Sequence, residues 1–261
     1  MDPASLAGIG LAFFCIFGSM ILEGGNPAAL ISPSAMLLVF GGTFGVAMAG
    51  GLMKDSTGFI GVLKSGLLAK PKSADSAITQ VVTFAEKARH DGLLALEASM
   101  KDIEDPFLRK GIGLAVDGTD PDELREILEN EIASLKNRHK AGAKFFENMG
   151  GFAPTLGIIG TVLGLVHVLQ NLSQPSKLGP LIAGAFIATL WGVMSANVMW
   201  LPLANRLKRV SEIEVHHAEL VLEGVLSIQA GANPRVIEER LLAHFPPKER
   251  EALSRDGNKA A

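Results

Sequence analysis

The sequence lacks charge over long stretches, although its overall composition is ordinary for a globular protein. The chain has 24 Lys and Arg and 27 Asp and Glu among 261 residues. Four stretches, 107 residues in total, contain none of them: Pro3 to Leu22, Gly24 to Met53, Asn148 to Ser176 and Leu178 to Asn205. A helix needs about 20 mostly apolar residues to cross a bilayer. The sequence therefore predicts an all-α integral membrane protein with four transmembrane helices.

Basic residues and cysteines are also missing where other classes of protein need them. The first Lys or Arg is Lys54, whereas a secretory signal peptide starts with basic residues. We therefore expect the first apolar stretch to be retained as a helix. The only cysteine is Cys15, so the chain has no internal disulfide. The net charge of −3 gives no electrostatic reason to expect a nucleic acid partner.

The sequence contains no motif of a common catalytic site. It has no GxxxxGK[ST], HExxH, CxxC or GxSxG. The run from Gly157 to Gly160 resembles part of a glycine-rich loop, but it lies inside an expected span. The pair His216-His217 has no nearby third ligand, so we expect it on a solvated helix face and not in a metal site. We predict that the chain is not an enzyme and holds no metal or cofactor.

The distribution of basic residues predicts the topology. The expected spans are Leu6–Leu22, Ser34–Met53, Phe152–Leu169 and Leu181–Leu203. The short connections Glu23–Pro33 and Gln170–Pro180 contain only Lys177 of the 24 basic residues. Basic residues favour the cytoplasmic side, so we expect both termini in the cytoplasm.

These spans divide the chain into four expected segments. They are a first transmembrane hairpin (1–53), a cytoplasmic helical loop (54–147), a second hairpin (148–205) and a cytoplasmic helical tail (206–261).

Local signals in the cytoplasmic segments mark helix boundaries. Asp91-Gly92 interrupts a helical pattern that resumes with the following leucines. Asp-Pro and Asn-Pro pairs favour helix starts, because the first side chain caps the helix and proline needs no donor in the first turn. They occur at Asp105-Pro106, Asp120-Pro121 and Asn233-Pro234. We expect a helix from Pro121 to Gly150, an extension of the fourth span to about Ala230, and a last helix ended by Pro246-Pro247.

Small residues recur every four positions in the expected spans, where they let helix backbones approach closely. The sets are Gly184, Ala188, Gly192 and Ala196; Gly160 and Gly164; and Gly41, Gly45 and Ala49. Packing within one chain and contact with other subunits are both open interpretations.

Acidic and basic side chains are absent from every expected span. Ion pathways through membranes normally depend on such groups, and besides Cys15 only His167 is titratable within an apolar run. If ions cross here, we expect another subunit to supply the acidic carrier. A self-contained transporter is therefore disfavoured.

Two segments resemble the flagellar stator proteins MotA and PomA, and the similarity extends over essentially the whole chain. One is the third-span run FAPTLGIIGTVLG, from Phe152 to Gly164, and the other is ARHDGLLALE, from Ala88 to Glu97. Pro202 in the fourth span also fits this family. ExbB and TolQ proteins share a similar third-span pattern, and an ExbB/TolQ-like energiser of an envelope partner is the alternative interpretation.

The resemblance implies a homopentamer in the bacterial inner membrane around two single-span MotB/PomB-type helices, each carrying the ion-binding Asp. Ion flow then turns the ring against the rotor protein FliG and drives motility. The matching positions are Pro154 and Pro202 for the conformational change, and Arg89 and Glu97 for rotor contact. His90 stands where relatives often have a second basic residue, which reduces the charge expected there at neutral pH.

The resemblance also bears on the transported ion. Thr161 and Thr189 resemble positions where sodium-type stators have threonine. Sodium is a hard cation that exchanges hydration water for oxygen ligands, so hydroxyls beside the partner's carboxylate favour Na⁺ over H⁺. The alternative is that each hydroxyl only bonds to a carbonyl four residues earlier in its own helix.

Overall fold

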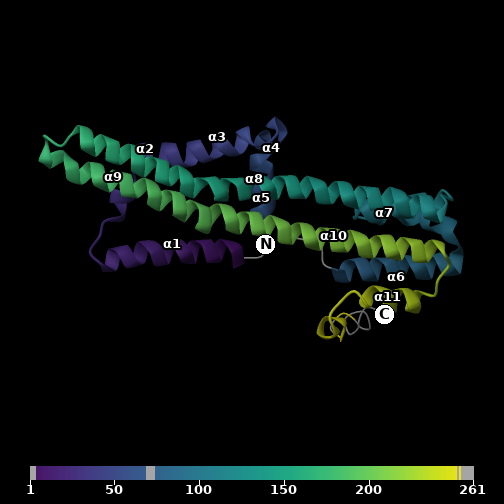
Figure 1. Ribbon diagram of the computed structural model, residues 1–261. Helices are drawn as coiled ribbons and strands as arrows, with labels where there is room; N and C mark the ends of the chain where they lie inside the picture. The colour runs from purple at the N-terminus through teal and green to yellow at the C-terminus, as the bar shows by residue number, and fades with distance from the viewer. Residues whose placement is uncertain (1–3, 69–73, 252, 254–261) are drawn as a thin grey trace. The chain divides into compact units, whose positions relative to one another are not determined.

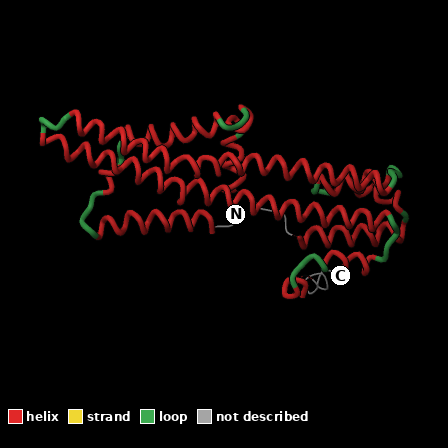
Figure 2. Tube along the Cα trace, in the orientation of Figure 1, coloured by secondary structure: helices red, strands yellow, loops and turns green. Residues whose placement is uncertain are grey.

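The computed structural model describes residues 4–68, 74–251 and 253, and every regular element among them is helical (Figures 1 and 2). The chain divides into two compact units. We call residues 1–70 and 138–210 the apolar unit, and residues 71–137 and 211–261 the charged unit. The all-helical prediction is confirmed for the described residues.

The first two apolar stretches form helices of different length. Helix α1 spans Ala4–Leu22, close to the expected first span. After the short 3₁₀ helix η1 (Pro27–Leu30), the second stretch forms α2 (Pro33–Met36), the π-helical turn η2 (Leu37–Gly41) and α3 (Gly42–Ala49). The expected end at Met53 is wrong. Helix α3 stops at Ala49 because Gly50-Gly51 favours termination over continuation.

Aromatic side chains hold the second stretch against the rest of the apolar unit. Helix α4 (Met53–Thr57) leads into α5 (Phe59–Leu68). Phe59 of α5 stacks on Phe146 with ring centroids 5.1 Å apart, and Phe44 of α3 meets Phe59 edge-on at 5.5 Å. Such aromatic pairs contribute about 0.5 to 1.5 kcal/mol beyond the area they bury. Residues 59–68 are therefore anchored in the apolar unit.

Helix α8 is a single 50-residue helix, Pro121–Gln170. It starts at the predicted Asp120 cap, whose carboxylate accepts a hydrogen bond from the Asp122 N–H at 2.9 Å. The expected end at Gly150 is wrong, because the helix continues through Gly150-Gly151. Tight packing explains this: an ideal Cβ on Gly150 would lie 2.5 Å from Leu201 Cδ2.

The last apolar stretch also continues as a long helix. It comprises α9 (Pro175–Met194), the π-helical turn η4 (Ser195–Trp200) and α10 (Leu201–Gln229). The predicted extension to about Ala230 is confirmed. The expected connection to Pro180 is too long, because α9 begins at Pro175, a residue suited to a first helical turn.

Three helical stretches among the described residues are long and apolar enough to cross a membrane. They are α1, the C-terminal part of α8, and the start of the continuous helix from Pro175 to Gln229. The run Pro33–Ala49 is apolar but shorter.

The charged unit contains α6 (Ala74–Asp91), α7 (Pro106–Val116), α11 (Pro234–Leu242) and parts of α8 and α10. The predicted break is confirmed: Gly92 has φ +87°, a conformation that glycine adopts at little cost. The segment after it forms a 3₁₀ helix, η3 (Leu93–Asp102), instead of a resumed α-helix. Helix α11 ends at Leu242, before the expected stop at Pro246.

A continuous apolar core fills the charged unit. Its fully buried side chains come from α6, η3, α7, α8, α10 and α11 and include Val81, Leu96, Leu108, Leu124, Val221 and Ile237. This core holds the segment that carries the predicted rotor-contact residues.

Candidate functional site

Glycines bring α8 and α9 into close contact within the apolar unit, where the two helices lie side by side (Figure 1). An ideal Cβ on Gly192 would lie 2.7 Å from the Ala153 carbonyl oxygen and 2.9 Å from Gly157 Cα. An ideal Cβ on Gly160 would lie 2.6 Å from Ala188 Cβ. Side chains at these glycines would separate the helices, so the glycines set the distance between the helix axes.

This close approach brings Thr161 of α8 and Thr189 of α9 together. Their hydroxyls are hydrogen-bonded to each other. Each hydroxyl oxygen lies 3.2 Å from the Gly157 carbonyl oxygen, and Thr161 Oγ1 lies 3.2 Å from the Ala185 carbonyl oxygen. The structure therefore places both predicted ion-path residues in one half-buried oxygen cluster.

The cluster has four oxygen atoms and no formal charge. Two hydroxyls supply only two protons, whereas each hydroxyl oxygen has two lone pairs. Lone pairs therefore remain that can coordinate a cation or accept another hydrogen bond. The bond from Thr161 to Gly157 is the expected contact within one helix, but the bonds of Thr189 to Thr161 and Gly157 cross between helices. The interpretation that each hydroxyl only bonds to a carbonyl four residues earlier in its own helix is thus incomplete.

Both predicted prolines disturb the helical hydrogen bonds. Pro154 lies inside α8, so the Gly150 carbonyl loses its donor four residues later. Pro202 follows the π-helical turn η4, in which the Leu201 N–H bonds to the Ala196 carbonyl five residues earlier. Because Gly150 packs on Leu201, the two irregular turns meet on facing helices.

His167 lies near the end of α8 and is exposed. Its carbonyl accepts a hydrogen bond from Asn171 Nδ2 at 2.8 Å. The side chain is separate from the threonine cluster, which contains no titratable group.

The predicted rotor-contact residues lie together in sequence around the break at Gly92, on the charged unit. Arg89 and His90 occupy the last turn of α6, and Glu97 lies in η3. All three are exposed, and neither Arg89 nor Glu97 forms an ion pair or hydrogen bond with another described residue. Both charges are available to a partner protein.

His90 differs from Arg89 and Glu97 because its side chain already has a hydrogen-bond partner. Its Nδ1 lies 2.6 Å from Asp91 Oδ1. This hydrogen bond and the negative charge of Asp91 raise the pKa of His90 above its ordinary value. The imidazole therefore keeps its proton to higher pH than an isolated histidine, but Asp91 offsets its positive charge.

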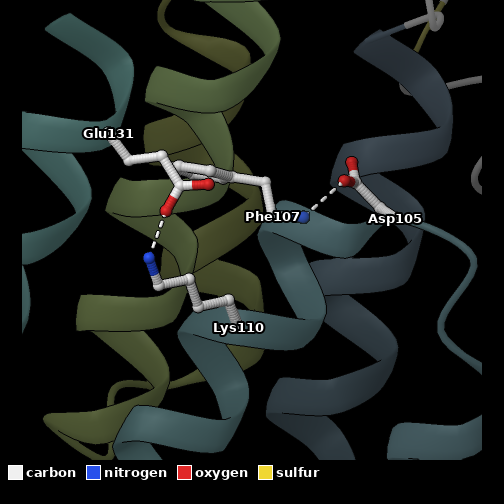
Figure 3. Close-up of polar contacts among 4 residues, drawn as sticks. All are labelled: Asp105, Phe107, Lys110 and Glu131. Carbon is white, nitrogen blue, oxygen red and sulfur yellow. Dashed lines mark hydrogen bonds and ion pairs between the residues drawn. The ribbon is translucent and has the colours of Figure 1, made fainter. Parts of the chain in front are cut away.

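A buried polar pair, missed from the sequence, supports this segment. Asp105 caps α7 by accepting a hydrogen bond from the Phe107 N–H at 3.0 Å, and Lys110 of α7 pairs with Glu131 of α8 (Figure 3). The other carboxylate oxygen of Asp105 lies 2.5 Å from Nε2 of His217 on α10.

The expectation that both adjacent histidines lie on a solvated face is wrong. His217 is buried beside Asp105, and the His216 ring packs edge-on against Phe245 at 5.4 Å. The Asp-Pro pair predicted the cap, but nothing local indicated a histidine 112 residues away. Among the described residues, no group of three potential ligands could hold a metal ion.

Comparison with known proteins agrees with this architecture. The profile of the MotA/TolQ/ExbB proton channel family matches residues 99–220. Motility protein A of Bacillus subtilis is 39% identical over 98% of this chain and 96% of its own length. Chemotaxis protein PomA of Vibrio alginolyticus is 35% identical over 92% of this chain and 94% of its own length.

Solved structures agree over nearly the whole fold. The structure of C. jejuni MotAB matches with a TM-score of 0.90 and 32% identity, covering 95% of this chain and 97% of that one. The flagellar MotAB stator complex of Bacillus subtilis matches with a TM-score of 0.88 and 38% identity, covering 95% and 98%.

Long apolar helices, a charge-free oxygen cluster and the family profile together define an ion-channel subunit of the inner membrane, not an enzyme. Within that class, the full-length similarity to motility protein A decides between the stator and ExbB/TolQ-like interpretations. The chain belongs to the MotA/PomA family of flagellar stator subunits, which assemble as oligomers with a MotB-type partner.

Proposed function

We propose that this stator subunit couples the flow of sodium ions to torque on the flagellar rotor. The observation that carries the choice of ion is the cluster of hydroxyl and carbonyl oxygens around Thr161 and Thr189. A proton needs no such set of ligands, whereas a hard cation needs several oxygens to replace its hydration shell.

The partner supplies the charge that this chain lacks. A MotB/PomB-type single-span helix places an Asp carboxylate beside α8 and α9, and the ion binds between that carboxylate and the threonine hydroxyls. A neutral cluster suits this role, because it stabilises a desolvated cation without trapping it.

The assembly is proposed as a homopentamer around two partner helices, with four spans per chain. Helix α1, the run Pro33–Ala49, and the apolar parts of α8 and α9–α10 form two hairpins, in which the short second span crosses a locally thinned bilayer. Both termini and the charged unit face the cytoplasm, since almost all basic residues lie in those segments.

Torque is proposed to reach the rotor through the charged unit. Ion binding changes the packing near Pro154 and Pro202, where both helices already depart from regular hydrogen bonding. Because α8 and α10 each extend into the charged unit without a break, rotation of the ring moves Arg89 and Glu97 against the rotor protein FliG.

The ion is tested by swimming speed against external sodium at constant pH and proton-motive force. We expect speed to rise with sodium, and Thr161→Ala to raise the half-saturating concentration about tenfold or more. An oxygen that binds a charged group contributes about 1.5 to 3 kcal/mol. Thr161→Ser should retain most of the activity, because it keeps the hydroxyl.

Thr155→Ala is the matched control. Thr155 lies on the same helix, and among the described residues its hydroxyl bonds only to the Phe152 carbonyl of that helix, at 2.7 Å. This variant should swim like the unmodified protein. Sodium-independent swimming of the unmodified protein would exclude the sodium proposal and leave the family assignment unchanged.

A further inference from the structure

A buried polar contact joins α10 to the turn that precedes α7 in the charged unit. The His217 Nε2 atom of α10 lies 2.5 Å from the Asp105 Oδ2 atom, and both side chains are about nine-tenths buried. A carboxylate only accepts hydrogen bonds, so Nε2 carries a proton and donates it. The other ring nitrogen, Nδ1, is buried and has no hydrogen-bond partner in the described part of the chain. Asp105 is therefore the polar group that orients the His217 ring.

The same carboxylate holds the start of α7 close to the end of η3. Its Oδ1 atom accepts a hydrogen bond from the Phe107 N–H at 3.0 Å (Figure 3). Just after η3, the Ile103 carbonyl accepts a hydrogen bond from Arg109 Nε at 3.0 Å, and the Ile103 side chain is buried. Hydrogen bonds therefore hold this turn on both sides, and the turn directly follows the segment η3 that carries Glu97.

Helix α7 also packs along α10 through apolar contacts. An ideal Cβ on Gly111 of α7 would lie 3.0 Å from Val225 Cγ2 of α10. This contact lies beyond Asp105 on one side and beyond His217 on the other, so the two helices run in the same direction. Apolar contacts have no preferred direction, whereas a hydrogen bond weakens steeply when its geometry changes. The pair of His217 and Asp105 therefore fixes the register of α7 on α10.

We propose that His217 is a positioning residue, which holds α7 and η3 on α10 so that movement of α10 reaches the segment that carries Glu97. The proposal rests on the torque mechanism proposed above. Helix α10 starts in the apolar unit at Leu201 and continues without a break past His217. Movement of this helix shifts the His217 ring, and the hydrogen bond passes the shift to the turn after η3. Without this bond, apolar contacts alone would let α7 slide along α10.

Hydrogen exchange on the full chain in complex with its partner subunit tests the positioning. His217→Leu removes the donor and should speed exchange of the backbone N–H groups in η3 and the first turn of α7 about tenfold. His217→Gln carries an amide donor at a similar reach and should keep exchange near that of the unmodified protein. His217→Asn carries the same amide on a shorter side chain and should exchange like His217→Leu.

His216→Leu is the matched control on the same helix. The His216 ring packs edge-on against Phe245 with ring centroids 5.4 Å apart, and it forms no hydrogen bond to α7 among the described residues. This variant should leave exchange in η3 and α7 unchanged.

Stall torque of single motors and ion flux through the reconstituted complex separate transmission from folding. His217→Leu should lower the stall torque severalfold while flux through vesicles that contain the complex stays normal, because His217 does not belong to the threonine cluster. His217→Gln should restore most of the torque. A residue that only stabilises the fold would lower assembly and flux together with torque.

Unchanged exchange in His217→Leu and His217→Asn, or equal acceleration in His216→Leu, would overturn the proposal. Faster exchange in η3 with normal torque would also overturn it, because the register of α7 would then not affect transmission. Arg89→Glu and Glu97→Lys test the rotor contact separately. If both are silent while His217→Leu still loses torque, the positioning role stands and the proposed contact residues are wrong.

Discussion

At the scale of residues, the two functional regions use polar groups in opposite ways. The hydroxyls of Thr161 and Thr189 are half-buried and bonded to each other and to backbone oxygens. Arg89 and Glu97 are exposed and have no partner among the described residues. The first arrangement suits a desolvated ion in a low-dielectric site, and the second suits long-range attraction to another protein.

Charge reversal tests the exposed pair. Arg89→Glu or Glu97→Lys should reduce swimming speed severalfold while membrane insertion and partner binding stay normal, because neither side chain supports the core. Glu126→Lys, an exposed change of the same kind on α8, is the control. A reversed charge on FliG should restore part of the torque. Normal swimming of both variants, singly and combined, would remove these residues from the rotor contact.

His90 should lose its charge at higher pH than an ordinary histidine. Because Asp91 raises the pKa of His90, the stabilising effect of this pair is fully present below the ordinary pKa and is lost as pH rises through the raised one. Asp91→Asn should shift the His90 titration to lower pH, measured by NMR of histidine-labelled complex with His90→Gln for assignment. An unchanged titration midpoint would contradict the role of Asp91.

At the scale of elements, the stripes of small residues have two different environments. Gly160, Gly192 and Ala188 pack at the contact of α8 and α9. By contrast, ideal Cβ atoms on Gly45 and Gly184 would meet nothing within 4 Å. Packing within one chain is therefore confirmed for the first set. The second set faces open space, and its contact with other subunits stays a prediction.

Matched alanine substitutions on α9 separate these environments. Both Gly184→Ala and Gly192→Ala gain helix propensity of about 1 kcal/mol. At Gly192 the new methyl group meets backbone atoms of α8, and such overpacking costs about 1 to 3 kcal/mol. We expect Gly192→Ala to lower the thermal stability of the purified complex and to stop swimming, whereas Gly184→Ala does not lower stability. Equal stability of the two variants would contradict the close packing.

At the scale of the whole molecule, the chain combines an apolar unit without a charged carrier and a charged unit with its own core. The two are joined through α8 and α10, each of which contributes residues to both units. In the proposed mechanism, ion chemistry and rotor contact thus lie in different units of one subunit, and the partner supplies the acidic group.

The isolated chain should consequently conduct almost no ions. Purified and reconstituted in vesicles without its partner, it should show flux close to that of empty vesicles, because its charge-free stretches contain no carboxylate to carry a cation. Adding the partner should restore flux, and adding a partner with Asn in place of its membrane Asp should not. Robust flux through the chain alone would instead indicate a self-contained channel.

The sequence by itself determined the features that depend on neighbouring residues. Charge-free stretches predicted the apolar helices, Asp105 and Asn233 predicted caps, and Asp91-Gly92 predicted the break. Each depends on hydrogen bonding, chain conformation or hydrophobicity within a few positions. The family pattern added the positions of Thr161 and Thr189, but not the bond between them.

Tertiary packing decided the rest. Only the contact of α8 with α9 joins the two threonine hydroxyls across 28 residues, and only the core of the charged unit buries His217 against Asp105. The same packing carries α8 through Gly150-Gly151, where local propensity favours an end. These features depend on which side chains meet between distant segments, and helix propensity and periodicity do not encode such contacts.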